Sequence, residues 1–250
     1  MGTVANNDAL ESHRLKANGP KGIKQELRVF RLAFRGCLKR VQADRMPNRL
    51  KLPHLLLIAY VVVFIALGIK PYARDVWFTE NMAIVPIVVI LVVLYRRGIQ
   101  LSNLSFIMMS FLVFIHTVGG HYTFERVPFD LVNKFFGFER NNYDRFGHFS
   151  VGFYAFPIME LLDRYDVIRK RWVAYLFALF SIMSVAMAYE LFEWVYAILS
   201  DPKAGIAVLG SQGDIWDAQK DMLCDTLGAV CALGIYCGVS RSRLKTAIRQ

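Results

Sequence analysis

Six long apolar segments dominate the sequence and limit the folds that are open to it. They fall at about residues 52–69, 77–95, 101–119, 146–162, 172–197 and 221–239. Each has roughly the length that a helix needs to span the hydrocarbon of a bilayer. Because no water is present there, the backbone must satisfy its own hydrogen bonds, and such segments become helices. The sequence therefore predicts an all-α, polytopic membrane bundle of about six transmembrane helices within residues 51–240.

The segment before the first apolar block has a different character. Residues 1–20 are polar and aperiodic, which indicates a disordered start. Residues 21–45 combine an apolar stripe at helical spacing with a basic one, a composition typical of an amphipathic helix in the headgroup region. The apolar stripe is Ile23, Leu27, Phe30, Phe34, Leu38 and Val41, and the basic one is Lys24, Arg28, Arg31, Arg35 and Lys39. The alternative is a helix packed on the protein's own cytoplasmic face.

The distribution of charge bears on partners and on orientation. Of the formal net charge of +10, most lies in residues 1–51, a pattern that favours anionic lipid headgroups and argues against nucleic acid. Most Lys and Arg residues fall on one side of the membrane if the N-terminus is inside, and the positive-inside rule then predicts that both termini are cytoplasmic. The polar loops at 119–145 and 200–220 would face outward, and residues 241–250 would form a basic cytoplasmic tail.

Four carboxylates form a column that leads into the last apolar segment. Asp214, Asp217, Asp221 and Asp225 are spaced so that they fall within roughly 80° of one helix face. The stripe continues through small residues that let another backbone approach closely; they are Ala218, Gly228 and Ala232. An ionised carboxylate in hydrocarbon is costly unless it is paired, metal-bound or hydrated. The column therefore marks a candidate functional site at the outer interface.

Three other polar stretches are predicted to reach the same level of the membrane. One contains His121, at the exit of the third segment. The second contains Asp144, Arg145 and His148, with Gly152 and Ala155 continuing that face as a second small-residue seam. The third contains Glu190 and Glu193, which share a face of the fifth helix. If the helices are antiparallel and adjacent, these groups surround one small volume.

Two chemistries would stabilise such a cluster. Imidazole and carboxylates together suit zinc, manganese or iron, so a divalent metal is the cofactor that the set would hold; the predicted ligands are His148, Glu190, Glu193, Asp217 and Asp221. Arg126, Arg145 and Lys220 offer salt bridges without a metal as the alternative. The predicted catalytic residues are His148, Asp221 and Glu190. The other members of the predicted polar site are His121, Asp144, Arg145, Asp214 and Asp225, whereas His54 and His116 are interpreted as packing or interfacial groups.

Four of these motifs, in order, resemble a known family. G-G-H-Y-T, N-N-Y-D-R-F-G-H-F, Y-E-L-F-E-W and G-S-Q-G-D-I-W-D-A-Q-K-D-M resemble the YjdF-like family of bacterial inner-membrane proteins, a group without an assigned activity, over about residues 50–240. The resemblance implies a multi-pass protein of the inner (plasma) membrane. The Asp144…His148, Glu190 and Asp221…Asp225 spacings are also similar to the VanZ-like pattern, although Arg145 stands where that pattern has Lys and Asp225 where it has Asn.

Three functions are consistent with these features. The first is an enzyme that acts on a lipid or a lipid-linked envelope component, with the metal or with His148 as base. The second is a non-catalytic scaffold or envelope-stress protein, in which the charges only fix the register of the helices. The third is an ion-coupled transporter, which would place acidic or broken helices near the middle of the membrane. The sequence leaves these three open.

Overall fold

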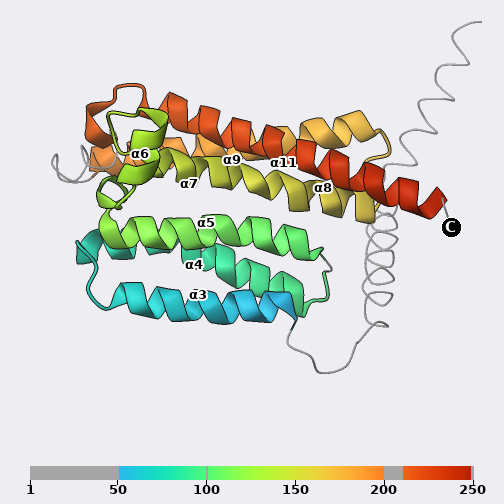
Figure 1. Cartoon of the computed structure of the whole chain (residues 1–250), viewed down its shortest axis with the longest axis horizontal. Helices are drawn as coiled ribbons and strands as arrows, with labels where there is room; N and C mark the ends of the chain where they lie inside the picture. Colours follow the sequence, from blue (N-terminus) through green and yellow to red (C-terminus); the bar gives the residue numbers. More distant parts are fainter. Residues whose placement is uncertain (1–50, 100, 200–210, 249–250) are drawn as a thin grey trace, which may run out of the picture. The chain divides into compact units, whose positions relative to one another are not determined.

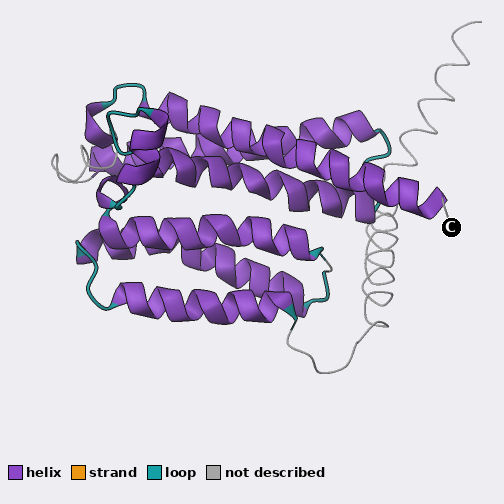
Figure 2. Cartoon of the chain, viewed as in Figure 1, coloured by secondary structure: helices purple, strands orange, loops and turns teal. Residues whose placement is uncertain are grey.

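The computed structural model describes residues 51–99, 101–199 and 211–248, and the regular structure in these ranges is helical (Figures 1 and 2). Of the described residues, 51–90, 101–199 and 211–248 form one compact unit, and 91–99 belong to a second. The predicted amphipathic helix at 21–45 lies outside the described residues. The helices are α3 (Leu52–Gly68), α4 (Arg74–Arg96), α5 (Asn103–Tyr122), η1 (Phe124–Arg126), α6 (Asp130–Phe136), α7 (Tyr143–Val151), η2 (Gly152–Tyr154), α8 (Ala155–Arg164), α9 (Arg171–Leu199), η3 (Ser211–Gly213) and α11 (Asp217–Ile248).

The predicted membrane bundle is confirmed. Among the described residues, α4, α5, α9 and the Asp217–Ser240 part of α11 are long and apolar enough to cross a membrane, and α3 is a shorter apolar helix. Many large apolar side chains on α3, α4, α9 and α11 are exposed, as is expected of surfaces that contact lipid. The sixth helix continues to Ile248, so most of the predicted basic tail extends this helix.

The fourth predicted segment is a broken helix made of α7, the 3₁₀ turn η2 and α8. Pro157 lies in the first turn of α8 and has no N–H, so the helical hydrogen bond to the Phe153 carbonyl group is missing. A short 3₁₀ turn is a common local adjustment at such a point. The break lies at the place where this segment approaches α11 most closely.

Two apolar clusters hold the bundle together, and α5 contributes to both. Met108 of α5 packs with α8, α9 and α11 around Phe156, Met159 and Ala232. Leu112 and Val113 of α5 pack instead with side chains of α3 and α4. Figure 1 shows α5 between α3 on one side and the pair α7 and α8 on the other. This central helix therefore joins the two halves of the compact unit.

Glu160 fastens α8 to the beginning of α5. Its buried carboxylate accepts hydrogen bonds from the Ser102 backbone N–H at 2.9 and 3.0 Å, and from the hydroxyls of Ser102 at 2.9 Å and Ser105 at 2.5 Å. Arg164 Nη2 donates a further bond at 2.9 Å. These donors include an N–H group that a helix start leaves without an intrahelical partner. The carboxylate is thus stabilised structurally, at the end of the bundle opposite the predicted site.

The two predicted small-residue seams pack against each other. A Cβ atom on Gly228 would overlap the carbonyl oxygen of Phe149, and one on Gly152 would overlap the backbone of α11. Ala155, Ala229 and Ala232, on either side of this crossing, are fully buried. Small residues thus bring the backbones of the broken helix and α11 into direct contact, which is how helices associate closely in membranes.

This crossing predicts different tolerance to substitution at two glycines of the same helix. Gly228→Ala forces a Cβ atom into backbone that has no rotamer to change, and we expect a loss of stability of about 1–3 kcal/mol. Gly234→Ala is the matched control, because a Cβ there meets nothing within 4 Å; alanine favours a helix by about 1 kcal/mol over glycine. Thermal unfolding of both variants in detergent measures the difference. Equal melting temperatures would contradict the contact.

Candidate functional site

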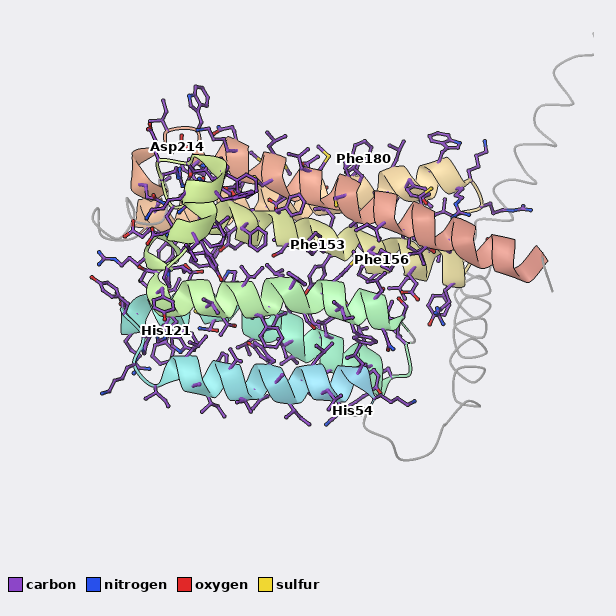
Figure 3. The ribbon with its side chains drawn as sticks, viewed as in Figure 1. His54, His121, Phe153, Phe156, Phe180 and Asp214 are labelled. Atoms are coloured by element: carbon purple, nitrogen blue, oxygen red, sulfur yellow. The ribbon has the colours of Figure 1, made fainter. Side chains whose placement is uncertain are left out.

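The polar residues of the predicted site gather at one end of the bundle, where α5 and α9 end and α7 and α11 begin. In Figure 3, Asp214 and His121 lie at this end and His54 lies at the opposite one. We call the following residues the polar cluster: Arg140, Asp144, Arg145, His148, Asp214, Asp217, Lys220, Asp221 and Asp225. Asp217, Asp221 and Asp225 are buried, so their charges must be balanced by neighbours rather than by bulk water.

Arg145 of α7 supplies most of that balance. Its Nη2 lies 3.0 Å from Asp214 Oδ2 and 2.5 Å from Asp217 Oδ1, and its Nη1 lies 3.2 Å from Asp221 Oδ1. The planar guanidinium group can donate to several carboxylates at once, which a lysine ammonium cannot do with the same geometry. Asp217, Asp221 and Asp225 of the predicted column lie on α11, whereas Asp214 lies in the segment before this helix. The column faces α7, and one arginine bridges three of its four members.

Two further cations close the outer end of the column. Arg140 Nη1 lies 3.0 Å from Asp214 Oδ2 and 3.1 Å from Asp217 Oδ1. Lys220 Nζ lies 2.6 Å from Asp214 Oδ2, and the backbone N–H of Trp216 donates to Asp214 Oδ1 at 3.1 Å. The hydrogen bond from Lys220 contributes most, followed by that from the Trp216 N–H, to holding the pKa of the Asp214 carboxyl below its ordinary value. Asp214 is thus an ionised part of the outer network.

Hydrogen bonds between Asn141 and Gln212 join the loop that carries Arg140 to the segment that carries Asp214. The backbone N–H of Asn141 donates to Gln212 Oε1 at 3.0 Å, and Gln212 Nε2 donates to the Asn141 carbonyl oxygen at 2.9 Å. The Asn141 side chain also donates to the carbonyl groups of Glu125 and Val127. The segment between α6 and α7 is therefore fixed to the segment before α11, which places Arg140 over the column.

Below Arg145, His148 is held between two carboxylates. Its Nδ1 lies 3.2 Å from Asp225 Oδ2, and its Nε2 lies 3.9 Å from Asp144 Oδ1. Asp225 can accept a hydrogen bond from the protonated Nδ1 of His148. In this tautomer the lone pair of Nε2 is available to bind a ligand. Asp144, His148 and Asp221 each offer one ligand atom, and these three atoms lie within 4.8 Å of one another. The arrangement has the donor types and the compactness of a metal centre.

The two glutamates of α9 lie beside this centre. Glu190 interacts electrostatically with His148, Asp221 and Asp225, and Glu193 interacts with Glu190 and Asp144. The ring of Tyr189 meets the imidazole of His148 edge to face, with centroids 6.1 Å apart. Glu190 Oε1 and Asp225 Oδ1 are buried and have no hydrogen-bond partner among the described residues. Such orphaned acceptors indicate a missing proton, water or cation.

Three residues are placed differently from the sequence prediction. His121 Nδ1 lies 2.6 Å from the Leu67 carbonyl oxygen, so this histidine fastens the end of α3 to the end of α5 and lies outside the polar cluster. Asp217, predicted as a metal ligand, bonds to Arg140 and Arg145. Asp144, predicted only as part of the polar surroundings, takes its place in the group of ligand atoms.

Three other polar residues were missed or interpreted differently. Glu80 of α4 lies 3.5 Å from His116 Nε2, and it interacts electrostatically with Asp144 and His148. His116 therefore borders the site, although its position in an apolar segment suggested packing. Arg140 lies in a loop, where no periodicity in the sequence indicates a role. The signal for Glu80 was present, since it is an acidic side chain within an otherwise apolar span, and such residues are usually functional or paired.

The geometry can now be compared with known proteins. Residues 52–242 match the family described as "Predicted membrane protein (DUF2238)". The chain belongs to this family. It is 35% identical over 172 residues to the "Inner membrane protein YjdF" of Escherichia coli (strain K12), which covers 68% of this chain and 81% of that protein. No solved structure matches the chain.

The YjdF-like resemblance is thereby confirmed, and the VanZ-like similarity stays a prediction. This DUF2238 chain is a multi-pass inner-membrane protein, as its apolar helices and its relative both indicate. The matched residues contain the whole polar cluster, together with Glu80, Glu190 and Glu193. The cluster therefore lies within the part of the chain that defines the family, and the basic leader lies outside that part.

The role of Arg145 in this DUF2238 chain predicts a large effect of its removal. Arg145→Ala removes the arginine that pairs with buried Asp221 and one of the two that contact buried Asp217, and breaking such a buried pair costs about 3–5 kcal/mol. Arg145→Lys should recover part of this loss. The control is Arg126→Ala. Arg126 is half-exposed, and it contacts exposed Glu125 and the ring and hydroxyl of exposed Tyr72; the loss of these surface contacts should cost only about 1 kcal/mol. The unfolding midpoints of both variants in detergent test this prediction. Similar midpoints for the two alanine variants would contradict the stabilising role of Arg145.

The lowered pKa of Asp214 predicts the sign of a pH effect. A carboxyl with a depressed folded-state pKa stabilises the protein above its unfolded-state pKa of about 3.9, and this contribution disappears as the pH falls through the folded-state value. The stability difference between wild type and Asp214→Asn should therefore be largest near neutral pH and should shrink in acid. Melting curves of both proteins between about pH 7 and pH 3 test this. If the stability difference grew on acidification, the effect of pH would have the opposite sign and would contradict the lowered pKa of Asp214.

Proposed function

We propose that the protein binds a divalent metal ion at Asp144, His148 and Asp221, and that the metal acts on the headgroup of a lipid or a lipid-linked envelope component. The observation that carries this proposal is the group of three ligand atoms within 4.8 Å of one another. They come from two helices that are locked together at Gly152 and Gly228. A site built on rigid elements keeps its geometry better than one on loops.

The position of Asp225 beside His148 supports the proposal. Metal-bound histidines usually donate their other ring N–H to a carboxylate or carbonyl group, which fixes the ring and its tautomer. Asp225 Oδ2 stands at 3.2 Å from Nδ1 in the position for this role. One nitrogen and two carboxylate oxygens suit zinc, manganese or iron better than magnesium or calcium, which prefer oxygen alone.

The remaining carboxylates have roles in this mechanism. A divalent ion lowers the pKa of a bound water molecule and polarises a carbonyl or phosphoryl group. Glu190 lies in the electrostatic neighbourhood of His148 and Asp221, and we assign it as the proton acceptor for that water. Glu193 is assigned as a further ligand or as a partner of Glu190. Without a metal, His148 would be the base.

The orientation of the site is part of the proposal. The concentration of Lys and Arg at the opposite end of the helices favours cytoplasmic termini, which would place the polar cluster at the outer leaflet. The basic segment 21–45 would then contact anionic headgroups of the inner leaflet, a prediction that rests on composition alone. Substrates would reach the cluster from the outer leaflet or the periplasm.

Metal binding to the purified full chain tests the proposal. We expect about one Mn²⁺ or Zn²⁺ per chain, and a loss of affinity of tenfold or more in His148→Ala and Asp221→Asn. Asp225→Asn should lose roughly 10–100-fold as an outer-shell partner. His54→Ala is the control, because His54 lies at the other end of the bundle (Figure 3). Wild-type protein that takes up no metal on titration would refute the site, and an unaltered lipid profile in cells carrying His148→Ala would refute the reaction.

A second function is favoured by the contacts of Arg145. One guanidinium group that satisfies three carboxylates is also what a scaffold without chemistry would use to fix the register of α7 and α11. In a scaffold, Asp221→Asn lowers stability and leaves metal content and lipid profile unchanged. Measuring melting and metal affinity on this one variant therefore separates the two functions.

A further inference from the structure

No described residue pairs with one edge of the Arg140 guanidinium group. Its Nη1 binds Asp214 and Asp217, whereas its Nε and Nη2 are buried and have no hydrogen-bond partner among the described residues. The side chain as a whole is 23% exposed, so it borders solvent while these two nitrogens do not. Buried donors are rarely left unpaired, and each such case calls for an explanation.

The chemistry of this edge selects its ligand. The N–H bonds of Nε and Nη2 point the same way and form a fork that matches two oxygens of one phosphate or carboxylate group. Nη1, on the other side, is occupied by aspartates that hold the fork in place. The aspartates of the cluster cannot also fill the fork without giving up the contacts that they already make.

The charge around Arg140 determines when an anion can bind. Arg140, Arg145 and Lys220 face Asp214, Asp217 and Asp221, so the outer part of the cluster is balanced and has no spare positive charge. Asp144 also interacts electrostatically with Arg140. A phosphate group would therefore be repelled unless a divalent cation sat at Asp144. Binding of the anion and of the cation should consequently favour each other, and such linkage is reciprocal.

We infer that the free edge of Arg140 binds two oxygens of a phosphate group carried by an amphiphile, next to the metal at Asp144, His148 and Asp221. This inference rests on the proposed function and names its substrate class. A lipid phosphate is favoured over free phosphate by the short helix α6, which ends four residues before Arg140. Its exposed side chains include Leu131, Phe135 and Phe136, an apolar surface suited to acyl chains beside the headgroup site.

The test compares ligands on the full chain in neutral-lipid nanodiscs with Mn²⁺ present. The probes are phosphatidic acid, diacylglycerol with the same acyl chains, and inorganic phosphate. Wild-type protein should bind phosphatidic acid roughly tenfold more tightly than diacylglycerol, and chelation should weaken this preference. Arg140→Lys keeps the charge but loses the fork, so the preference should fall to about threefold, while Arg140→Gln should abolish it. Arg126→Lys is the control in the same outer region.

Each result bears on one proposal. A preference that Arg140→Lys retains in full would overturn the inference, as would equal binding of both lipids by wild-type protein, a result that needs no variant to fold. Inorganic phosphate bound as tightly as phosphatidic acid would overturn the lipid as its source. The proposed function is tested separately by Mn²⁺ titration of the wild-type protein without any probe. It fails if no Mn²⁺ binds.

Discussion

The close crossing of α7 and α11 is the contact on which the site depends. Gly152 and Gly228 allow the two backbones to touch, and only at that separation do the short side chains of α11 reach across. Aspartate is the shorter of the two acidic side chains, and ordinary packed helices lie about 8–10 Å apart. Larger residues at the crossing would move Asp221 and Asp225 away from Arg145 and His148 and lengthen the contacts between them.

That geometry divides the aspartate column into two electrostatic environments. The outer members, Asp214 and Asp217, share Arg140 and Arg145, and Lys220 adds a third cation at Asp214. The innermost member, Asp225, pairs with His148, and among the described residues its Oδ1 has no hydrogen-bond partner. Arginine and lysine are thus concentrated at the outer end of the column. The deeper part still contains carboxylates, and Glu80, Glu190 and Glu193 add to them. The deeper environment is therefore the one that calls for an added cation or proton.

Much of this could be predicted from residue spacing. Hydrophobic length located the spans, and the spacing of Asp217, Asp221 and Asp225 placed them on one face of α11, because both depend only on local helix geometry. The two small-residue seams were identified for the same reason. Asp214 lies before the helix begins, and its ion pairs hold it beside the other three. The break before α8 was not predicted, because proline is tolerated in membrane helices in several ways. Which carboxylate joins His148 could not be predicted either, since that choice depends on helix rotation: Asp144 lies in the group and Asp217 does not.

Residues in loops were harder still, because no periodicity constrains them. Arg140 reaches the column only because the Asn141 and Gln212 amides join two segments that are 71 residues apart. His121 has a motif that suggested the site, yet the carbonyl group of Leu67 binds its imidazole. A sequence motif shows that a polar side chain is present. Its role depends on the residues that the tertiary structure places next to it.

Asp221 connects the two environments and gives the site a means of coupling them. Its Oδ1 lies 3.2 Å from Arg145 Nη1, and its carboxylate offers one of the three candidate ligand atoms. A cation bound to this carboxylate would weaken the bond between Asp221 and Arg145, and Arg145 would then interact more strongly with Asp214 and Asp217. Those aspartates in turn hold Arg140, so occupancy of the deeper centre would change the contacts that orient the outer arginine. In this arrangement an ion-pair network that stabilises the helices and a centre that binds a ligand are parts of one system, because they share a carboxylate.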